Sequence, residues 1–140
     1  MANDPISLLL IGSDSALLEG LSQSLGALGY ATTATDSLRD ARDLAARRRP
    51  LIALMEAELA VTSRGEVLSI PLAPGGALIL YNVGGEHDAE VLSPSLQRVV
   101  LANIMLPLER QRLAALVQYV AQRVRVTGRP RDTPPEQAAQ

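Results

Sequence analysis

The sequence has 140 residues, of which 47% are hydrophobic and 20% are charged, and this is the composition of one globular domain that buries a core of its own. Its 13 basic and 15 acidic residues give a formal net charge of -2, so no overall charge attracts the chain to nucleic acid or to an anionic membrane. Every basic residue is an arginine and cysteine is absent, which excludes lysine Schiff bases, a Walker-type phosphate loop, disulfides and thiolate metal sites. The apolar runs are too short to span a membrane and the first five residues lack the pattern of a signal peptide, so we expect a cytoplasmic protein without a membrane partner.

The first part of the chain predicts a strand, a helix and a second strand. Residues 6–11 (ISLLLI) form a short apolar run, which is typical of a strand covered on both faces of a parallel sheet. Residues 13–15 (SDS) are all good N-cap types, and the leucines that follow at helical spacing predict a helix that ends at Gly29. Residues 31–35 are short and rich in threonine, which favours a second strand.

The second helix is predicted to begin at Asp36, as its N-cap, and to stop at Pro50. Its last turn carries three arginines at residues 47–49, and Asp43 lies four residues before Arg47, a spacing that favours an ion pair. We interpret the arginines as a solvated helix end, because cations complement the negative end of the helix dipole and acidic residues on the same helix offset them. A nucleic-acid patch is the alternative interpretation.

The rest of the sheet is predicted from three further apolar runs. Residues 51–55 and 77–81 predict the third and fourth strands, and between them we expect at most a short third helix near residues 64–69. A short fourth helix is expected at residues 87–92 and the fifth strand at residues 98–105. The alternation of strands and helices predicts an α/β fold with a doubly wound, five-stranded parallel sheet that has helices on both faces.

The last helix is predicted to have Pro107 in its first turn and to end near Val126. Leu116, Tyr119 and Arg123 form a ridge beside the apolar stripe that faces the core. A tyrosine flanked by arginine on such a ridge is typical of a protein interface, and we expect these three residues to contact a partner.

The domain organisation follows from the end of this helix. Residues 127–140 contain one glycine, three prolines and no periodic apolar residue, which predicts a disordered tail or linker. We therefore expect a single folded domain at residues 1–126.

Four segments of the chain resemble the bacterial response-regulator receiver domain in their order and spacing, over residues 6–126. These segments are LLLIGSDSALLEGL, RRRPLIALMEAEL, GALILYN and IMLPLERQRLAAL. The resemblance implies the flavodoxin-like variant of the doubly wound fold, with its site at the carboxyl ends of the strands.

In the receiver family an acidic pair ends the first strand and a phosphorylated aspartate ends the third. The resemblance places the acidic pair on Gly12 and Ser13 and the phosphorylated position on Glu56. A register one residue later brings Asp14 into the acidic pair. The complete degenerate pocket implied by the resemblance comprises Gly12, Ser13, Asp14, Glu56, Tyr81, Leu106 and Pro107.

The other two family positions also differ. A serine or threonine ends the fourth strand of a receiver, where this chain has Tyr81, and a lysine ends the fifth, where this chain has Leu106 before a retained Pro107. Making an aspartyl phosphate requires a carboxylate nucleophile, Mg²⁺ held by carboxylates, and a cation that balances the phosphoryl charge. The resemblance therefore implies a pseudo-receiver with no catalytic residue, no metal and no cofactor.

Two of the pocket residues have alternative interpretations. Asp14 lies between serines at the start of a predicted helix, which favours an N-cap over a metal ligand. Glu56 is either a permanent mimic of a phosphorylated aspartate or a side chain that points to solvent.

Two functional hypotheses remain open from the sequence. The first is a non-enzymatic signal-transduction module of the two-component type, which binds a protein partner or forms a homodimer without phosphotransfer. It is either free-standing or the regulatory domain of a transcription regulator, and it contacts nucleic acid only through an attached output domain. The second is a small-ligand or anion sensor, or a weak enzyme, that uses the pocket around Gly12, Asp14, Glu56 and Tyr81.

Overall fold

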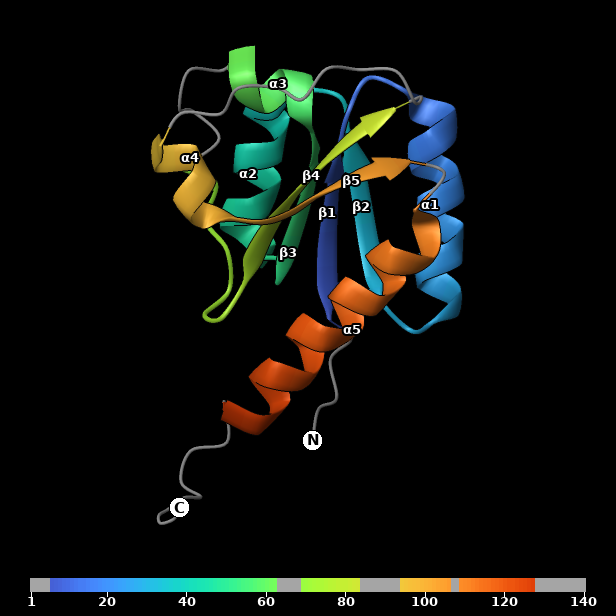
Figure 1. Cartoon of the computed structure of the whole chain (residues 1–140), viewed down its shortest axis with the longest axis vertical. Coiled ribbons are helices and arrows are strands. Elements are labelled where there is room, and N and C mark those ends of the chain that lie inside the picture. The colour runs from blue at the N-terminus through green and yellow to red at the C-terminus, as the bar shows by residue number, and fades with distance from the viewer. Residues whose placement is uncertain (1–5, 63–68, 84–93, 107–108, 128–140) are drawn as a thin grey trace.

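The computed structural model describes residues 6–62, 69–83, 94–106 and 109–127 (Figure 1). Its five strands form one sheet in the order β2-β1-β3-β4-β5, and every neighbouring pair is parallel. The predicted α/β fold with a doubly wound, five-stranded parallel sheet is therefore confirmed. The strands are β1 (Ser7–Ile11), β2 (Ala31–Thr35), β3 (Ile52–Glu56), β4 (Ala77–Val83) and β5 (Val100–Leu106).

Alternating side chains of the central strands enter two apolar cores, one on each face of the sheet. On β1, Leu8 and Leu10 belong to one core, whereas Leu9 and Ile11 belong to the other. The reason is that successive side chains of a strand point to opposite faces. All four side chains are buried, and a strand buried on both faces forms the continuous apolar run from which β1 was predicted.

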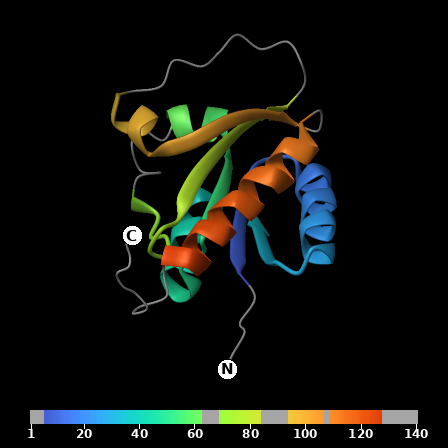
Figure 2. The same ribbon diagram turned by 60° about the horizontal axis from the view of Figure 1, so that its bottom comes forward.

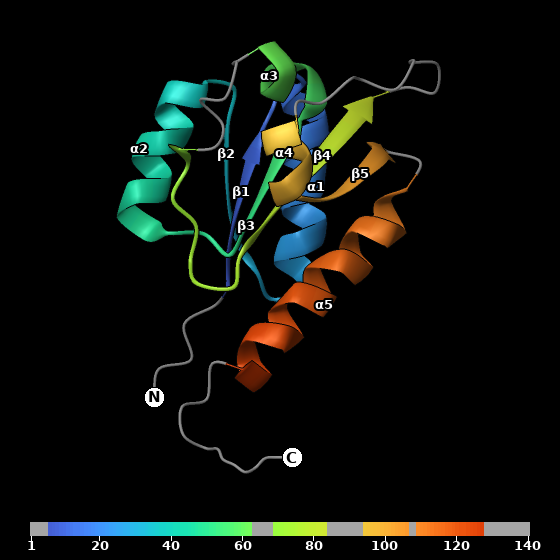
Figure 3. The same cartoon turned by 60° about the vertical axis from the view of Figure 1, so that its left-hand side comes forward.

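Helices cover both faces of this sheet. α1 (Ser15–Ala27) and α5 (Arg110–Thr127) contribute to the core that contains Leu8, whereas α2 (Leu38–Arg48) and α3 (Ala57–Thr62) contribute to the opposite core. Figure 3 shows α2 on one side of the sheet and α1 and α5 on the other, and Figure 2 shows α5 crossing the strands diagonally.

The N-caps of the first two helices are set by short side chains. Asp14 caps α1, because its Oδ1 accepts a hydrogen bond from the Leu17 backbone N at 3.1 Å, and this confirms the predicted cap. The prediction of Asp36 as the cap of α2 is wrong by one residue. Ser37 has the extended backbone of a cap, and its Oγ accepts from the Asp40 backbone N at 3.1 Å.

The structure has a short third helix directly after β3, where none was predicted. α3 follows β3 without a break, whereas the helix expected near residues 64–69 falls almost entirely outside the described ranges, which leave out residues 63–68. α3 packs through Ala57 and Ala60, which are both buried. Small residues of this kind give no apolar periodicity, and a helix this short depends on packing rather than on its own propensity.

The last third of the chain differs from the prediction mainly at element boundaries. The helix expected at residues 87–92 lies outside the described ranges, and the structure has α4 (Pro94–Val99), so that β5 begins at Val100. α5 ends at Thr127, within one residue of the predicted end. Pro107 and residues 128–140, where a tail or linker was expected, also lie outside the described ranges. No helix within those ranges combines the length and the apolar character of a membrane span.

Candidate functional site

The strands β1, β3 and β4 end together at the carboxyl edge of the sheet. Ile11 on β1 pairs with Met55 on β3, and Glu56, the last residue of β3, pairs with Tyr81 on β4. From β1 the chain moves outward to β2 and then returns across β1 to β3, which makes the gap between β1 and β3 the switch point of the sheet. Ligands of doubly wound folds bind at this point. The residues that follow the strand ends there form the candidate site.

The structure connects two of the predicted pocket residues directly. Glu56 Oε1 accepts a hydrogen bond from the backbone N of Ser13 at 3.0 Å and a second from the Ser13 Oγ at 2.9 Å. Glu56 is half-buried, and its carboxylate turns toward the end of β1. The Glu56 carboxylate, which the resemblance places at the phosphoacceptor position, is therefore held by Ser13, which the resemblance places in the acidic pair.

Gly12 has no room for a side chain. A Cβ atom built on Gly12 would stand 1.8 Å from the Tyr81 hydroxyl oxygen, 3.1 Å from Tyr81 Cζ and 3.6 Å from Glu56 Oε1. The Tyr81 side chain is 0% exposed, so its ring is enclosed on all sides. The aromatic residue of β4 therefore reaches past β3 and occupies the space into which an acidic side chain at position 12 would project.

The Tyr81 hydroxyl lies in an unusual electrostatic environment. It is a buried polar atom with no hydrogen-bond partner among the described residues. Burial raises the pKa of Tyr81 well above its ordinary value, and the negative charges of Glu56 and Asp14 raise it further. The hydroxyl therefore remains protonated and neutral at physiological pH.

Leu106 stands at the end of β5, where the resemblance places a lysine. Its side chain is 0% exposed and belongs to the same apolar core as Tyr81. A cation at this position would be buried among apolar side chains, which carries a large desolvation cost. Pro107, the next residue of the predicted pocket, lies outside the described ranges.

The carboxyl edge does not fit Mg²⁺, the ion that a receiver-type site implies. Position 12 has no side chain, one oxygen of Glu56 already accepts two hydrogen bonds from Ser13, and Asp14 accepts the capping hydrogen bond of α1. Within the described ranges no three histidine or acidic residues come together as a group that could hold a metal ion. Mg²⁺ prefers an octahedral set of oxygen ligands, which these residues do not assemble.

A cavity of about 280 Å³ lies beside this edge, between α1 and β2. Of the four residues in the ligand-sensor hypothesis, Gly12 lines this cavity, whereas Asp14, Glu56 and Tyr81 do not. The other lining residues are Ser15, Leu18, Glu19, Ser22, Ala34, Thr35 and Asp36.

The predicted interface residues lie on α5, away from the carboxyl edge. Tyr119 is 52% exposed, and the guanidinium carbon of Arg123 lies 5.5 Å from the centre of its ring, within the range of a cation–π contact. Leu116 is half-buried and packs against the core instead. The ridge therefore presents Tyr119 and Arg123 at the surface, with Leu116 beneath them.

Two contacts of the site were not predicted from the sequence. These are the hydrogen bonds between Ser13 and Glu56 and the packing of the Tyr81 hydroxyl against Gly12. The only sequence signal for the second is the glycine itself, since a residue without Cβ often marks a close approach of another group.

No protein-family model and no curated protein sequence matches the chain. Thirty-five solved chains match its structure. The signal receiver domain of a Vibrio parahaemolyticus protein aligns over 89% of this chain and 96% of its own length, with a TM-score of 0.66 and 16% identity. A CheY-like response-regulator receiver domain from Methanospirillum hungatei aligns over 85% of this chain and 96% of its own, with a TM-score of 0.62 and 20% identity.

A longer protein is also among the matches. NtrX from Brucella abortus aligns over 89% of this chain but over 28% of its own length, with a TM-score of 0.67 and 13% identity. At identities of 20% or less, these matches support a shared fold but not shared site residues. The chain has the fold of response-regulator receiver domains.

Proposed function

We propose that this chain is a non-enzymatic signal-transduction module of the two-component type, a pseudo-receiver that works without phosphotransfer. The receiver fold supports the first part of the proposal. The observation that carries the second part is the Tyr81 hydroxyl, which takes up the space beside Gly12 where a metal-binding carboxylate would have to stand.

The chemistry of phosphotransfer supports the same conclusion. A nucleophile misplaced by about 1 Å can lose on the order of a hundredfold in rate, and Glu56 is one methylene longer than aspartate and is hydrogen-bonded to Ser13. Leu106 supplies no cation, and the sequence contains no lysine that could replace it. Phosphoryl transfer to this chain would therefore lack a bound metal ion, a cation that balances the phosphoryl charge, and a free nucleophile.

Incubation of the full chain with acetyl phosphate and Mg²⁺ is expected to add no phosphoryl group, as measured by intact mass spectrometry. The same result is expected for Glu56→Asp, because a shorter carboxylate restores neither the metal site nor the cation. A receiver domain with a complete site serves as the positive control. An adduct that forms on the unmodified chain and disappears in Glu56→Gln would contradict the proposal.

We further propose that the surface formed by α4, β5 and α5 carries the contact with a partner, and that a second copy of this chain is the favoured partner. Val99 and Leu101 expose large apolar side chains along this surface, and Tyr119 with Arg123 adds an aromatic and a cationic group. β5 is an edge strand of the described sheet, and apolar edge strands favour pairing or covering.

Truncating Tyr119 is expected to weaken this dimer. A tyrosine buried at a two-fold interface contributes about 1 to 2 kcal/mol, so Tyr119→Ala should raise the dimer dissociation constant about fivefold or more, and Arg123→Glu should act in the same direction. Sedimentation equilibrium measures the change, with circular dichroism as the check on folding. Leu28→Ala is the matched control, because Leu28 is 60% exposed but follows α1 and lies outside the proposed surface. An unmodified chain that stays monomeric at high concentration would favour a heterologous partner instead.

The setting of the module is part of the same proposal. We place it in the cytoplasm, either free-standing or as the regulatory domain of a transcription regulator. The alignment with little more than a quarter of NtrX supports the second arrangement, in which contacts with nucleic acid belong to the attached output domain.

A further inference from the structure

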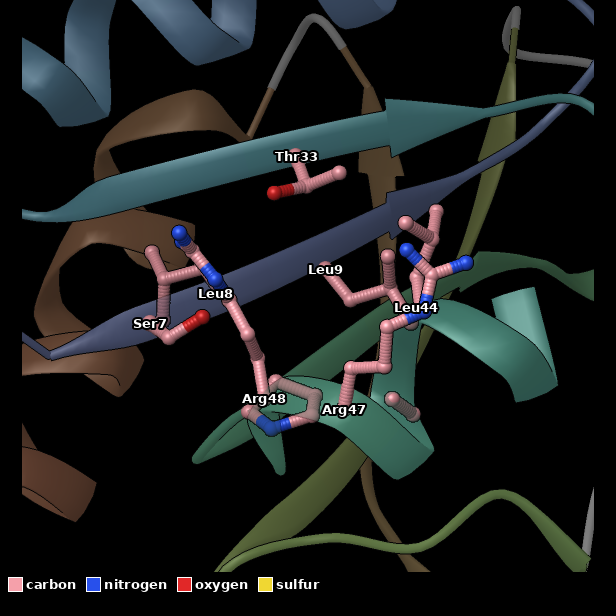
Figure 4. Close-up of a pocket in the computed structure, with 9 residues that line it drawn as sticks. Ser7, Leu8, Leu9, Thr33, Leu44, Arg47 and Arg48 are labelled. Atoms are coloured by element: carbon pink, nitrogen blue, oxygen red, sulfur yellow. The ribbon is translucent and has the colours of Figure 1, made fainter. Parts of the chain in front are cut away.

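A second cavity lies on the α2 face of the sheet, toward the amino ends of β1 and β2 (Figure 4). It measures about 300 Å³, is open to solvent on one side, and is lined by β1, β2 and the last turns of α2. Because it includes Ser7, the first residue of β1, it lies at the opposite end of that strand from Gly12. The space beside Gly12 that Tyr81 fills is therefore not part of this cavity.

Two arginines line this cavity. Figure 4 shows the side chains of Arg47 and Arg48 leaving α2 in different directions, Arg48 toward Ser7 and Leu8 on β1 and Arg47 toward Leu44. Thr33 lies on the neighbouring strand. Neither guanidinium has a carboxylate within ion-pair distance among the described residues, so the pair of Arg47 with Asp43 that their spacing favours is not formed. Both arginines are exposed residues, so the rim of the cavity carries two positive charges that no described acidic residue neutralises.

Two hydroxyl groups face the same space. Leu9 pairs with Thr33 across β1 and β2, and Ser7 lies two residues before Leu9, so all three side chains project from the same face of the sheet. Ser7 and Thr33 are half-buried, and neither side chain makes a hydrogen bond within the described part of the chain. The hydroxyls and the guanidinium groups are therefore all available as donors to a ligand.

The remaining wall of the cavity is apolar. Leu9 and Pro50 are buried, and Leu44 is half-buried beside them. Ligand cavities commonly combine such apolar walls with a few convergent polar groups, and about 300 Å³ is at the small end of their range. A compact organic molecule fits this volume, whereas a nucleic-acid strand does not.

We propose that this cavity binds a small organic phosphate monoester. The phosphate group carries a charge of about -1.5 to -2 at neutral pH, which matches two guanidinium groups, and the planar fork of arginine donates two parallel hydrogen bonds to its oxygens. Ser7 and Thr33 donate to the remaining oxygens, and the organic part lies against Leu9 and Leu44. Such a ligand would connect α2 to β1 and β2, and it would give the module an input that is independent of its carboxyl edge.

The test uses phenyl phosphate as the probe, because it joins a dianion to a compact apolar body. Titration of the full chain, followed by ¹⁵N NMR, is expected to show saturable shifts in α2, β1 and β2. Phenol, which lacks the charge, should bind at least about tenfold more weakly, since hydrogen bonds to charged groups contribute about 1.5 to 3 kcal/mol. Inorganic phosphate, which lacks the apolar body, should bind more weakly than phenyl phosphate.

Two pairs of arginine variants with the same change in net charge distinguish binding at the cavity from a general attraction to positive charge. Arg47→Gln with Arg48→Gln should weaken phenyl phosphate binding at least about tenfold, whereas Arg39→Gln with Arg110→Gln removes the same charge outside the cavity and should change it less than about twofold. Thr33→Val, which keeps the shape of the side chain, should weaken binding about two- to fivefold.

Three results would overturn the proposal. They are the absence of saturable binding, an equal loss in the two pairs of arginine variants, and shifts confined to residues around Ser13 and Glu56. Displacement of phenyl phosphate by an acidic peptide or an oligonucleotide that binds more tightly at the same arginines would assign the surface to a macromolecule instead.

Discussion

Replacing Leu106 by lysine is expected to lower the free energy of unfolding at pH 7 by about 4 to 5 kcal/mol. Burial can depress the pKa of a lysine by about 3 to 5 units, and keeping a lysine of ordinary pKa about 10.4 neutral at pH 7 costs about 1.4 kcal/mol per unit. Leu106 is 0% exposed in the core that also contains Tyr81, so the ammonium group would be buried among apolar side chains. Urea denaturation followed by circular dichroism measures the change. The lysine of a receiver site therefore cannot be restored to this chain without a large loss of stability.

A matched control lies outside the proposed partner surface. Leu28, which follows α1, is 60% exposed, and Leu28→Lys should change the free energy of unfolding by less than about 1 kcal/mol. The Leu106→Lys cost should also shrink, relative to the unmodified chain, as the pH rises toward about 10, where a lysine in the unfolded chain loses its proton. A Leu106→Lys variant as stable as the original would mean that its ammonium group reaches a carboxylate at the carboxyl edge and that the phosphotransfer site can be rebuilt.

Replacing Gly12 by alanine is expected to lower the free energy of unfolding by about 1 to 3 kcal/mol, the usual cost of overpacking a closed site. The added methyl group would stand 1.8 Å from the Tyr81 hydroxyl oxygen, and the enclosed tyrosine ring cannot move aside freely. Gly20→Ala is the control of opposite sign. Gly20 lies within α1 with nothing within 4 Å of its missing Cβ, so alanine there should stabilise the chain by about 0.5 to 1 kcal/mol.

Tyr81→Phe should rescue Gly12→Ala in part. Without the hydroxyl the nearest tyrosine atom to the new methyl group is Cζ, at 3.1 Å, which requires only a small adjustment. The two substitutions should therefore couple by about 1 kcal/mol or more in a double-mutant cycle. Tyr81→Phe by itself should be neutral or slightly stabilising, because the hydroxyl has no partner among the described residues. Strictly additive effects would show that the hydroxyl is not what excludes a side chain at position 12.

The strands and the first two helices were predictable from local patterns. β1, β3 and β4 are buried on both faces, and such strands produce apolar runs in the sequence. α1 begins at Ser15, directly after Asp14, whose side chain caps it whatever the helix packs against. No helix was predicted at the residues of α3 and α4, because each has six residues and helices this short are stabilised by tertiary packing.

The candidate site was predictable as a set of positions but not as a set of contacts. The resemblance placed Ser13 and Glu56 at the carboxyl ends of two different strands, and only the folded sheet brings the Ser13 Oγ to 2.9 Å from the carboxylate. This hydrogen bond could not be read from the sequence, which left open that Glu56 points to solvent. Whether Glu56 mimics a phosphorylated residue stays a prediction.

The three arginines at residues 47–49 also show what the sequence determines and what the tertiary structure decides. The sequence by itself determined that three arginines end α2, because helix spacing and Pro50 require it. All three are exposed, as predicted for a solvated helix end, and the position of α2 against β1 and β2 also places Arg47 and Arg48 at the rim of a cavity. Local residue patterns thus determined the elements and their order, since propensity, capping and burial act along the chain. Tertiary structure alone decided that Tyr81 fills the space beside Gly12 and that two arginines line the second cavity, because these contacts join residues that only the packing of the sheet brings together.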